Sequence, residues 1–106
     1  MRKRKQGRGV PHNRVILLVD DNSDDRVLLR RAFSKAGIIN LVHDAATGRE
    51  AIRYLAGEGP YADRERFPLP GIVLLDLNMP EIDGFGVLEW MRSKMVTGGV
   101  LVIVLT

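Results

Sequence analysis

The sequence lacks cysteine, long apolar runs and any abundance of aromatic side chains. Its 106 residues contain no Cys, one Trp, two Tyr and three Phe. Without cysteine the chain can form neither a disulfide framework nor a thiolate metal site. No apolar run approaches the roughly 18 residues that a membrane span needs, and no apolar segment of signal-peptide length follows the basic start. We therefore expect a cytoplasmic protein that makes no membrane contact.

The sequence also lacks the motifs of a histidine metal site and of a nucleotide-binding loop. The two histidines, His12 and His43, have no second histidine or cysteine at metal-ligand spacing, so we interpret both as structural or incidental. No Gly-rich phosphate loop follows the first apolar run, where the residues are Asp20-Asp21-Asn22-Ser23. This absence argues against a nucleotide-binding protein.

Acidic residues are absent from the first 14 positions. Six of the 16 basic residues lie there, and all 13 acidic residues follow them. The net charge of +3 therefore divides into a basic segment and a mildly acidic body. Residues 1–14 bury too little apolar surface to offset their ordering entropy, so we expect a flexible tail. Four clustered charges without interleaved aromatics favour a solvated tail over a nucleic-acid contact.

The remaining residues, 15–106, suffice for one small domain in which apolar runs alternate with helical patterns. Unbroken apolar runs of this length are typical of strands buried on both faces of a parallel sheet. The order βαβαβαβ predicts right-handed crossovers and helices on both faces of that sheet. The expected strands are 15–19, 38–45, 72–76 and 100–105, and the expected helices are 24–36, 47–56 and 85–94.

The first expected helix carries apolar residues at helical spacing, and we expect them to face the sheet. They are Leu29, Ala32, Phe33 and Ala36, with Val27 and Leu28 widening the stripe. Either Asn22 or Ser23 can cap this helix. The connection 57–71 is long for a helix-to-strand loop, and the sequence does not decide whether its apolar residues pack inward or face a partner.

Three carboxylates follow directly after buried strands. Asp20 and Asp21 end the run 15–19, and Asp76 ends the run 72–75. If the chain winds outward from the first strand in both directions, these strand ends meet at the switch point where α/β sheets bind ligands. Converging carboxylates disfavour one another's ionised form, and oxygen ligands without Cys or paired His indicate Mg²⁺ or Mn²⁺.

An aspartate at such a site can act as a nucleophile and form an aspartyl-phosphate. The hydroxyl of Thr106, at the end of the last apolar run, can hydrogen-bond a phosphoryl oxygen. Helix capping and turn formation explain Asp24, Asp25 and Asp83 well. They explain poorly the three carboxylates placed directly after four or five buried residues.

Together these motifs resemble the receiver domain of two-component response regulators. The resemblance covers residues 15–106 and rests on Val19-Asp20-Asp21, on Leu75-Asp76-Leu77-Asn78-Met79-Pro80 with Asp83-Gly84, and on Val104-Leu105-Thr106. The loop 59–70 resembles a subgroup of single-domain regulators that work with phytochrome-type sensor kinases. The resemblance implies a flavodoxin-like, doubly wound α/β sheet with strand order 2-1-3-4, here an incomplete (βα)₃β unit.

The resemblance also implies a role for each site residue. Asp76 is the phosphoacceptor, and Asp20 and Asp21 form the metal-binding acidic pair with Asp76. The backbone carbonyl of Asn78 completes the protein's Mg²⁺ ligands, and Thr106 is the switch hydroxyl. The phosphoryl group comes from a phosphohistidine of a sensor histidine kinase. Such a domain catalyses at most its own phosphorylation and dephosphorylation and is not a conventional enzyme.

The sequence departs from this family after its fourth strand. The fifth strand, the last two helices and a lysine have no counterpart, so we expect a fragment of a longer protein. A hydrophobic edge at 100–105 also favours a homodimer through that strand and helix 85–94. Two other functions stay open: a pseudo-receiver that serves protein–protein interaction or assembly without phosphorylation, and a Mg²⁺-dependent hydrolase, which would lack an obvious general base.

Overall fold

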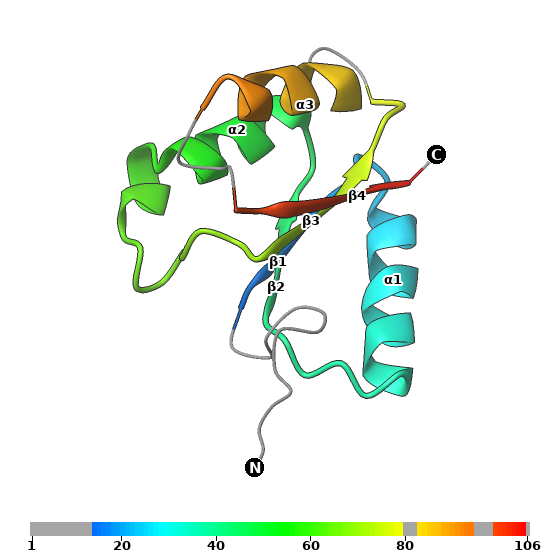
Figure 1. Cartoon of the computed structure of the whole chain (residues 1–106). Coiled ribbons are helices and arrows are strands. Elements are labelled where there is room, and N and C mark those ends of the chain that lie inside the picture. Colours follow the sequence, from blue (N-terminus) through cyan, green and yellow to red (C-terminus); the bar gives the residue numbers. More distant parts are fainter. Residues whose placement is uncertain (1–13, 80–82, 95–98, 106) are drawn as a thin grey trace.

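Four parallel strands form a single sheet with helices on both of its faces (Figure 1). The computed structural model describes residues 14–79, 83–94 and 99–105. The strand order is β2-β1-β3-β4, which confirms the predicted doubly wound sheet. The strands are β1 (Ile16–Val19), β2 (Val42–Ala45), β3 (Ile72–Asp76) and β4 (Leu101–Leu105). The helices are α1 (Ser23–Lys35), α2 (Gly48–Ala56) and α3 (Gly84–Arg92), with a 3₁₀ turn η2 (Gly59–Ala62).

The register of the central strands fixes where the chain's carboxylates emerge. β1 pairs with β3 from Ile16 opposite Ile72 to Val19 opposite Leu75. On its other side β1 pairs with β2, and the amide of Asp20 donates to the carbonyl of Ala45 at 3.1 Å. The carboxyl ends of β1 and β3 therefore lie side by side at one edge of the sheet. No helix in the described part of the chain is long and apolar enough to cross a membrane.

Each helix begins at a side-chain cap that the sequence supplies. Asn22, and not Ser23, caps α1, because its side chain accepts from the amide of Asp25. Thr47 and Asp83 cap α2 and α3 in the same way. At its other end α2 stops at Gly57, whose φ of 72° is left-handed and favours glycine.

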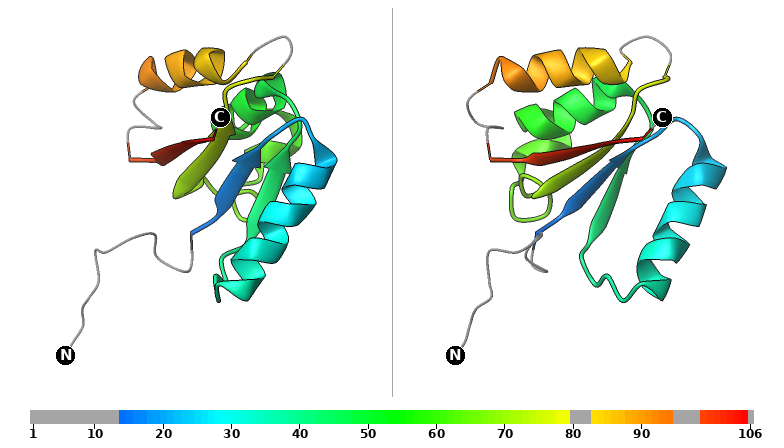
Figure 2. Two further views of the ribbon diagram at one scale, coloured as in Figure 1. Left: turned by 90° about the vertical axis from the view of Figure 1, so that its right-hand side faces the viewer. Right: turned by 45° about the vertical axis from the view of Figure 1, so that its right-hand side comes forward.

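The two faces of the sheet are covered to different extents (Figure 2). Alternate residues of β1 and β3 pack beneath α2 and α3 in the larger core cluster. On the opposite face α1 is the one described helix that lies over the sheet, and none of its residues is buried. Leu29 and Phe33 contact this face, whereas Val27 and Leu28 are 54% and 60% exposed. The sheet therefore covers only part of the apolar stripe of α1.

The second strand is shorter than predicted. We expected residues 38–45, but β2 begins at Val42, opposite Ile16 of β1. Leu41 still accepts from the amide of Ile16 through its carbonyl at 2.9 Å, but the paired register with β1 begins one residue later, at Val42. Ile39 in this stretch is 75% exposed.

The long connection between α2 and β3 packs inward. Tyr61, Phe67 and Leu69 contact the larger core cluster, which answers the question that the sequence left open. The ring of Phe67 lies 5.3 Å from that of His43. Arg64 donates to the carbonyls of Tyr54 and Leu55 at 2.9 and 2.8 Å and so satisfies the last turn of α2.

Candidate functional site

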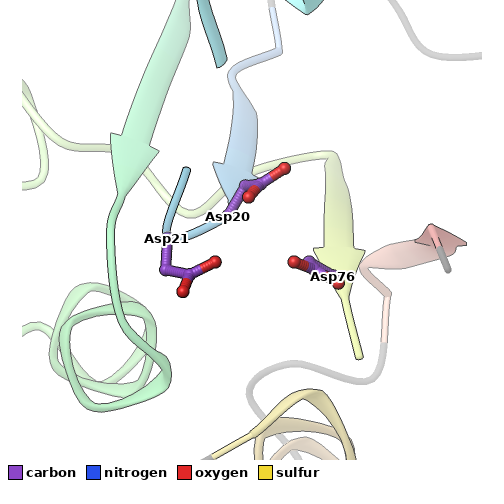
Figure 3. A group of neighbouring side chains, drawn as sticks. All are labelled: Asp20, Asp21 and Asp76. Atoms are coloured by element: carbon purple, nitrogen blue, oxygen red, sulfur yellow. The ribbon is translucent and has the colours of Figure 1, made fainter. Parts of the chain in front are cut away.

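Three aspartates meet where β1 and β3 end (Figure 3). Asp20 follows the last residue of β1, Asp21 lies on the turn into α1, and Asp76 is the last residue of β3. One carboxylate oxygen from each lies within 4.8 Å of the others. Asp20 is buried at 5% exposure, Asp21 is exposed, and Asp76 is half-buried. The side chains of Asp21 and Asp76 point toward one another across the gap between the strand ends.

The same local hydrogen bond orients the two strand-end carboxylates. The amide of Asn22 donates to Oδ1 of Asp20 at 2.9 Å, and the amide of Asn78 donates to Oδ1 of Asp76 at 2.9 Å. Aspartate side chains commonly bond the backbone two residues further on, and this bond fixes the turn that follows the strand. Each carboxylate is thus held by the turn that directs the chain away from the sheet.

The electrostatics of the site disfavour three bare carboxylates. The pKa of Asp20 is raised above its ordinary value of 3.8, first by burial and then by the charges of Asp76, Asp25 and Asp21. The hydrogen bond from Asn22 acts in the opposite direction. A cation between the carboxylates would relieve this repulsion. The donors are all oxygen and belong to one edge of the sheet, so they fit Mg²⁺ or Mn²⁺.

An open pocket of about 470 Å³ lies beside the cluster. Asp20 and Asp76 line it together with Asp25, the α1 residue Leu28 and the β4 residue Leu105. The acidic edge is therefore reachable from solvent, and one wall of the approach to it is apolar.

Comparisons with known proteins identify the family and support the fold. The sequence profile of the response regulator receiver domain matches residues 16–106. The chain belongs to this family. Response regulator Rcp1 of Synechocystis sp. is 33% identical over 93 residues, covering 88% of this chain and 61% of that protein. The probable methanogenesis regulatory protein FilR2 of Methanothrix harundinacea is 36% identical, covering 87% of this chain and 57% of that protein.

Several solved response regulator structures are similar to this receiver domain. The bacteriophytochrome response regulator AtBRR superposes with a TM-score of 0.79 at 36% identity, covering 89% of this chain and 66% of that one. The phosphorylated cyanobacterial phytochrome response regulator RcpA gives 0.78 at 35% identity, covering 87% and 64%. The Mn²⁺-bound form of Rcp1 gives 0.76 at 32% identity, covering 86% and 63%. This receiver domain thus spans about two thirds or less of the length of these relatives.

The structure brings together most of the predicted site residues of this receiver domain. Asp20, Asp21 and Asp76 form the cluster, and Asn78 is exposed two residues beyond Asp76. Thr106 lies outside the described residues. The roles of all five, as metal ligands, phosphoacceptor and switch hydroxyl, stay predictions.

The sequence did not predict a positioning role for two residues beside the site, Gly84 and Arg26. The main chain of Gly84, the first residue of α3, approaches β3 so closely that a Cβ would lie 2.5 Å from the carbonyl oxygen of Asp76. The sequence showed Gly84 only as part of an Asp-Gly turn. Arg26 of α1 donates to the carbonyl oxygen of Asp20. Its position within a basic helix face gave no signal for this contact, because the face also suits a solvated surface.

Proposed function

We propose that this chain is a phosphoacceptor receiver domain of a two-component signal transduction system. A sensor histidine kinase would supply the phosphoryl group, and Asp76 would accept it. The observation that carries the proposal is the convergence of Asp20, Asp21 and Asp76 at one edge of the sheet, beside an open pocket.

Each residue would contribute a defined part of the transfer. An oxygen of Asp76 attacks the phosphorus atom of the phosphohistidine while the P–N bond breaks, and the imidazole takes up a proton. Asp20 and Asp21, with the backbone carbonyl of Asn78, would hold Mg²⁺ or Mn²⁺ beside Asp76, and the hydroxyl of Thr106 would bond the bound phosphoryl group. The metal ion would supply charge neutralisation for the transferring group. The Mn²⁺-bound structure of the related Rcp1 supports this choice of ion.

The identity of the partner rests on the relatives. Their names associate AtBRR and RcpA with phytochromes. We therefore propose a phytochrome-type histidine kinase as the phosphodonor. We also propose a homodimer through β4 and α3. β4 is an edge strand of the described sheet and pairs with β3 on one side, so its other side can pair with a second chain.

Phosphorylation with a small donor tests the proposal directly. Incubation with acetyl phosphate and Mg²⁺ should give acid-labile, hydroxylamine-sensitive phosphate on the wild-type chain. Asp76→Asn should abolish this label, because an amide is no nucleophile for phosphorus. Asp24→Asn, the same chemical change at an exposed position in the first turn of α1, should leave it intact.

Two outcomes would contradict the proposal. One is a wild-type chain that takes up no phosphate but still binds a histidine kinase, as an interaction module would. The other is a label that persists in Asp76→Asn, which would place the acceptor elsewhere.

A further inference from the structure

Arg26 links the acidic edge of the sheet to the neighbouring strand β2. Its Nη1 donates to the main-chain carbonyl of Asp20, and its Nε lies 3.4 Å from Oδ2 of Asp44. The side chain of Arg26 is only 17% exposed. Asp44 faces α1 because it pairs with Leu18, whose side chain contacts α1. One guanidinium therefore joins α1, the end of β1 and β2.

The packing of α1 gives this contact its importance. No residue of α1 is buried, so apolar contacts hold the helix only loosely against the sheet. The remaining ties are polar, and Arg30 provides a second one through bonds to Asp44 at 2.8 Å and to the carbonyl of Val42 at 2.9 Å. The bonds that Arg30 makes to described residues all go to β2, whereas Arg26 also reaches Asp20.

The charge of Arg26 by itself works against a cation at this site. A guanidinium that bonds the main chain of Asp20 repels a divalent ion held at the same edge of the sheet. Arg26 donates its hydrogen bond to the main-chain carbonyl of Asp20. This bond fixes the backbone from which the carboxylates of Asp20 and Asp21 extend, and it does not compete for the oxygens of those carboxylates. Any benefit of Arg26 to metal binding must therefore come from geometry.

We infer that Arg26 is a positioning residue for the metal site. By contacting both the Asp20 carbonyl and Asp44, Arg26 sets the position of the backbone at Asp20 and Asp21 relative to Asp76. This inference rests on the proposed function, because it concerns the same carboxylates. Groups that orient metal ligands commonly change metal affinity 10–100-fold when removed.

Calorimetric titration with Mg²⁺ alone separates geometry from charge. Arg26→Met should weaken binding about tenfold. Arg30→Met removes an equal charge and another contact to Asp44 but spares Asp20, so its affinity should equal or slightly exceed that of the wild type. Arg26→Lys keeps the charge but offers a single ammonium in place of the fork, and its affinity should fall between those of the wild type and Arg26→Met.

Melting in a chelator, without metal, shows whether each variant is folded before titration. Tighter binding by both methionine variants would mean that Arg26 acts only through charge, and would overturn the inference while leaving the proposed function intact. No binding by the wild-type chain would overturn both. Should Arg26→Met fail to fold, Arg26→Lys decides alone: a several-fold loss supports the inference, and wild-type affinity overturns it.

Discussion

At the scale of single residues, His43 is held neutral by its surroundings. Its ring lies 5.7 Å from that of Tyr54, and its Nε2 is buried with no hydrogen-bond partner in the described part of the chain. Burial, and then the charge of Arg30, lower the pKa of His43 below 6.5, while a backbone bond to Arg66 and the charge of Asp44 act in the opposite direction. A proton on His43 would therefore disfavour the fold.

The sign of the resulting pH dependence follows from linkage. As the pH falls below 6.5, the unfolded chain binds a proton that the folded chain resists, so this contribution to stability is complete above pH 6.5 and is lost toward the lower folded pKa. The free energy of unfolding should fall with pH in this window by at most about 1.4 kcal/mol per pH unit. Urea unfolding at several pH values should show a shallower fall for His43→Phe.

His12→Gln, at the only other histidine of the chain, is the matched control and should keep the wild-type slope. Equal slopes for His43→Phe and the wild type would contradict the assignment of this titration to His43.

Residues at strand ends could be predicted, whereas residues that act across elements could not. Asp20, Asp21 and Asp76 each follow an apolar run, and parallel strands bring such positions to one edge. Arg26 has no comparable signal, because its two partners lie six residues back and on another strand. A periodic pattern records which face a residue is on but not which backbone carbonyl it reaches.

At the scale of elements, the close approach of α3 to β3 depends on Gly84. A Cβ there would meet the carbonyl oxygen of Asp76 at 2.5 Å and Cα of Leu77 at 2.6 Å, both backbone atoms that cannot rotate away. Gly84→Ala should therefore displace the start of α3 from the end of β3. We expect a loss of about 1–3 kcal/mol in the free energy of unfolding, the usual range for overpacking.

Chemical denaturation measures this loss, and Gly99→Ala is the control. Among the described residues, no atom lies within 4 Å of a Cβ added at Gly99, so alanine there should change stability by less than about 0.5 kcal/mol. A Gly84→Ala variant as stable as the wild type would show that α3 can shift without loss.

The type and order of every described strand and α-helix followed from the sequence, but extent and burial did not. Residues 38–41 read as strand because three of the four are apolar, yet the paired register begins only at Val42, opposite the first residue of β1. The stripe of α1 is amphipathic, yet Leu28 is 60% exposed. Apolar patterning shows which face avoids water, and the surface available to cover that face is a property of the assembled sheet.

At the scale of the whole molecule, the sheet is well covered on one face and sparsely on the other. The face toward α2 and α3 buries its side chains fully, with Leu17, Val73 and Leu75 at 0% exposure. On the other face an apolar pocket of about 310 Å³ opens between α1 and β4, lined by Phe33, Leu74 and Ile103 among others. This contrast indicates where the molecule has apolar surface left to bury.

β4 joins that surface to an edge of the sheet, and we predict that the chain self-associates there. The strand pairs only with β3 among the described strands, its residues 101–105 carry no charge, and Leu101 and Ile103 are 53% and 42% exposed. Uncharged apolar edges pair readily with a second chain.

In sedimentation velocity the wild-type mass should rise with concentration, and Ile103→Lys should weaken association at least about tenfold, because it places a charge at the centre of the paired edge. Leu41→Lys replaces an apolar side chain that is 60% exposed beside β2, at the opposite edge of the sheet, and should leave association unchanged. A wild-type mass that stays monomeric at every concentration would contradict the pairing, and an equal effect of both lysines would mean that general apolar exposure, rather than the β4 edge, drives association.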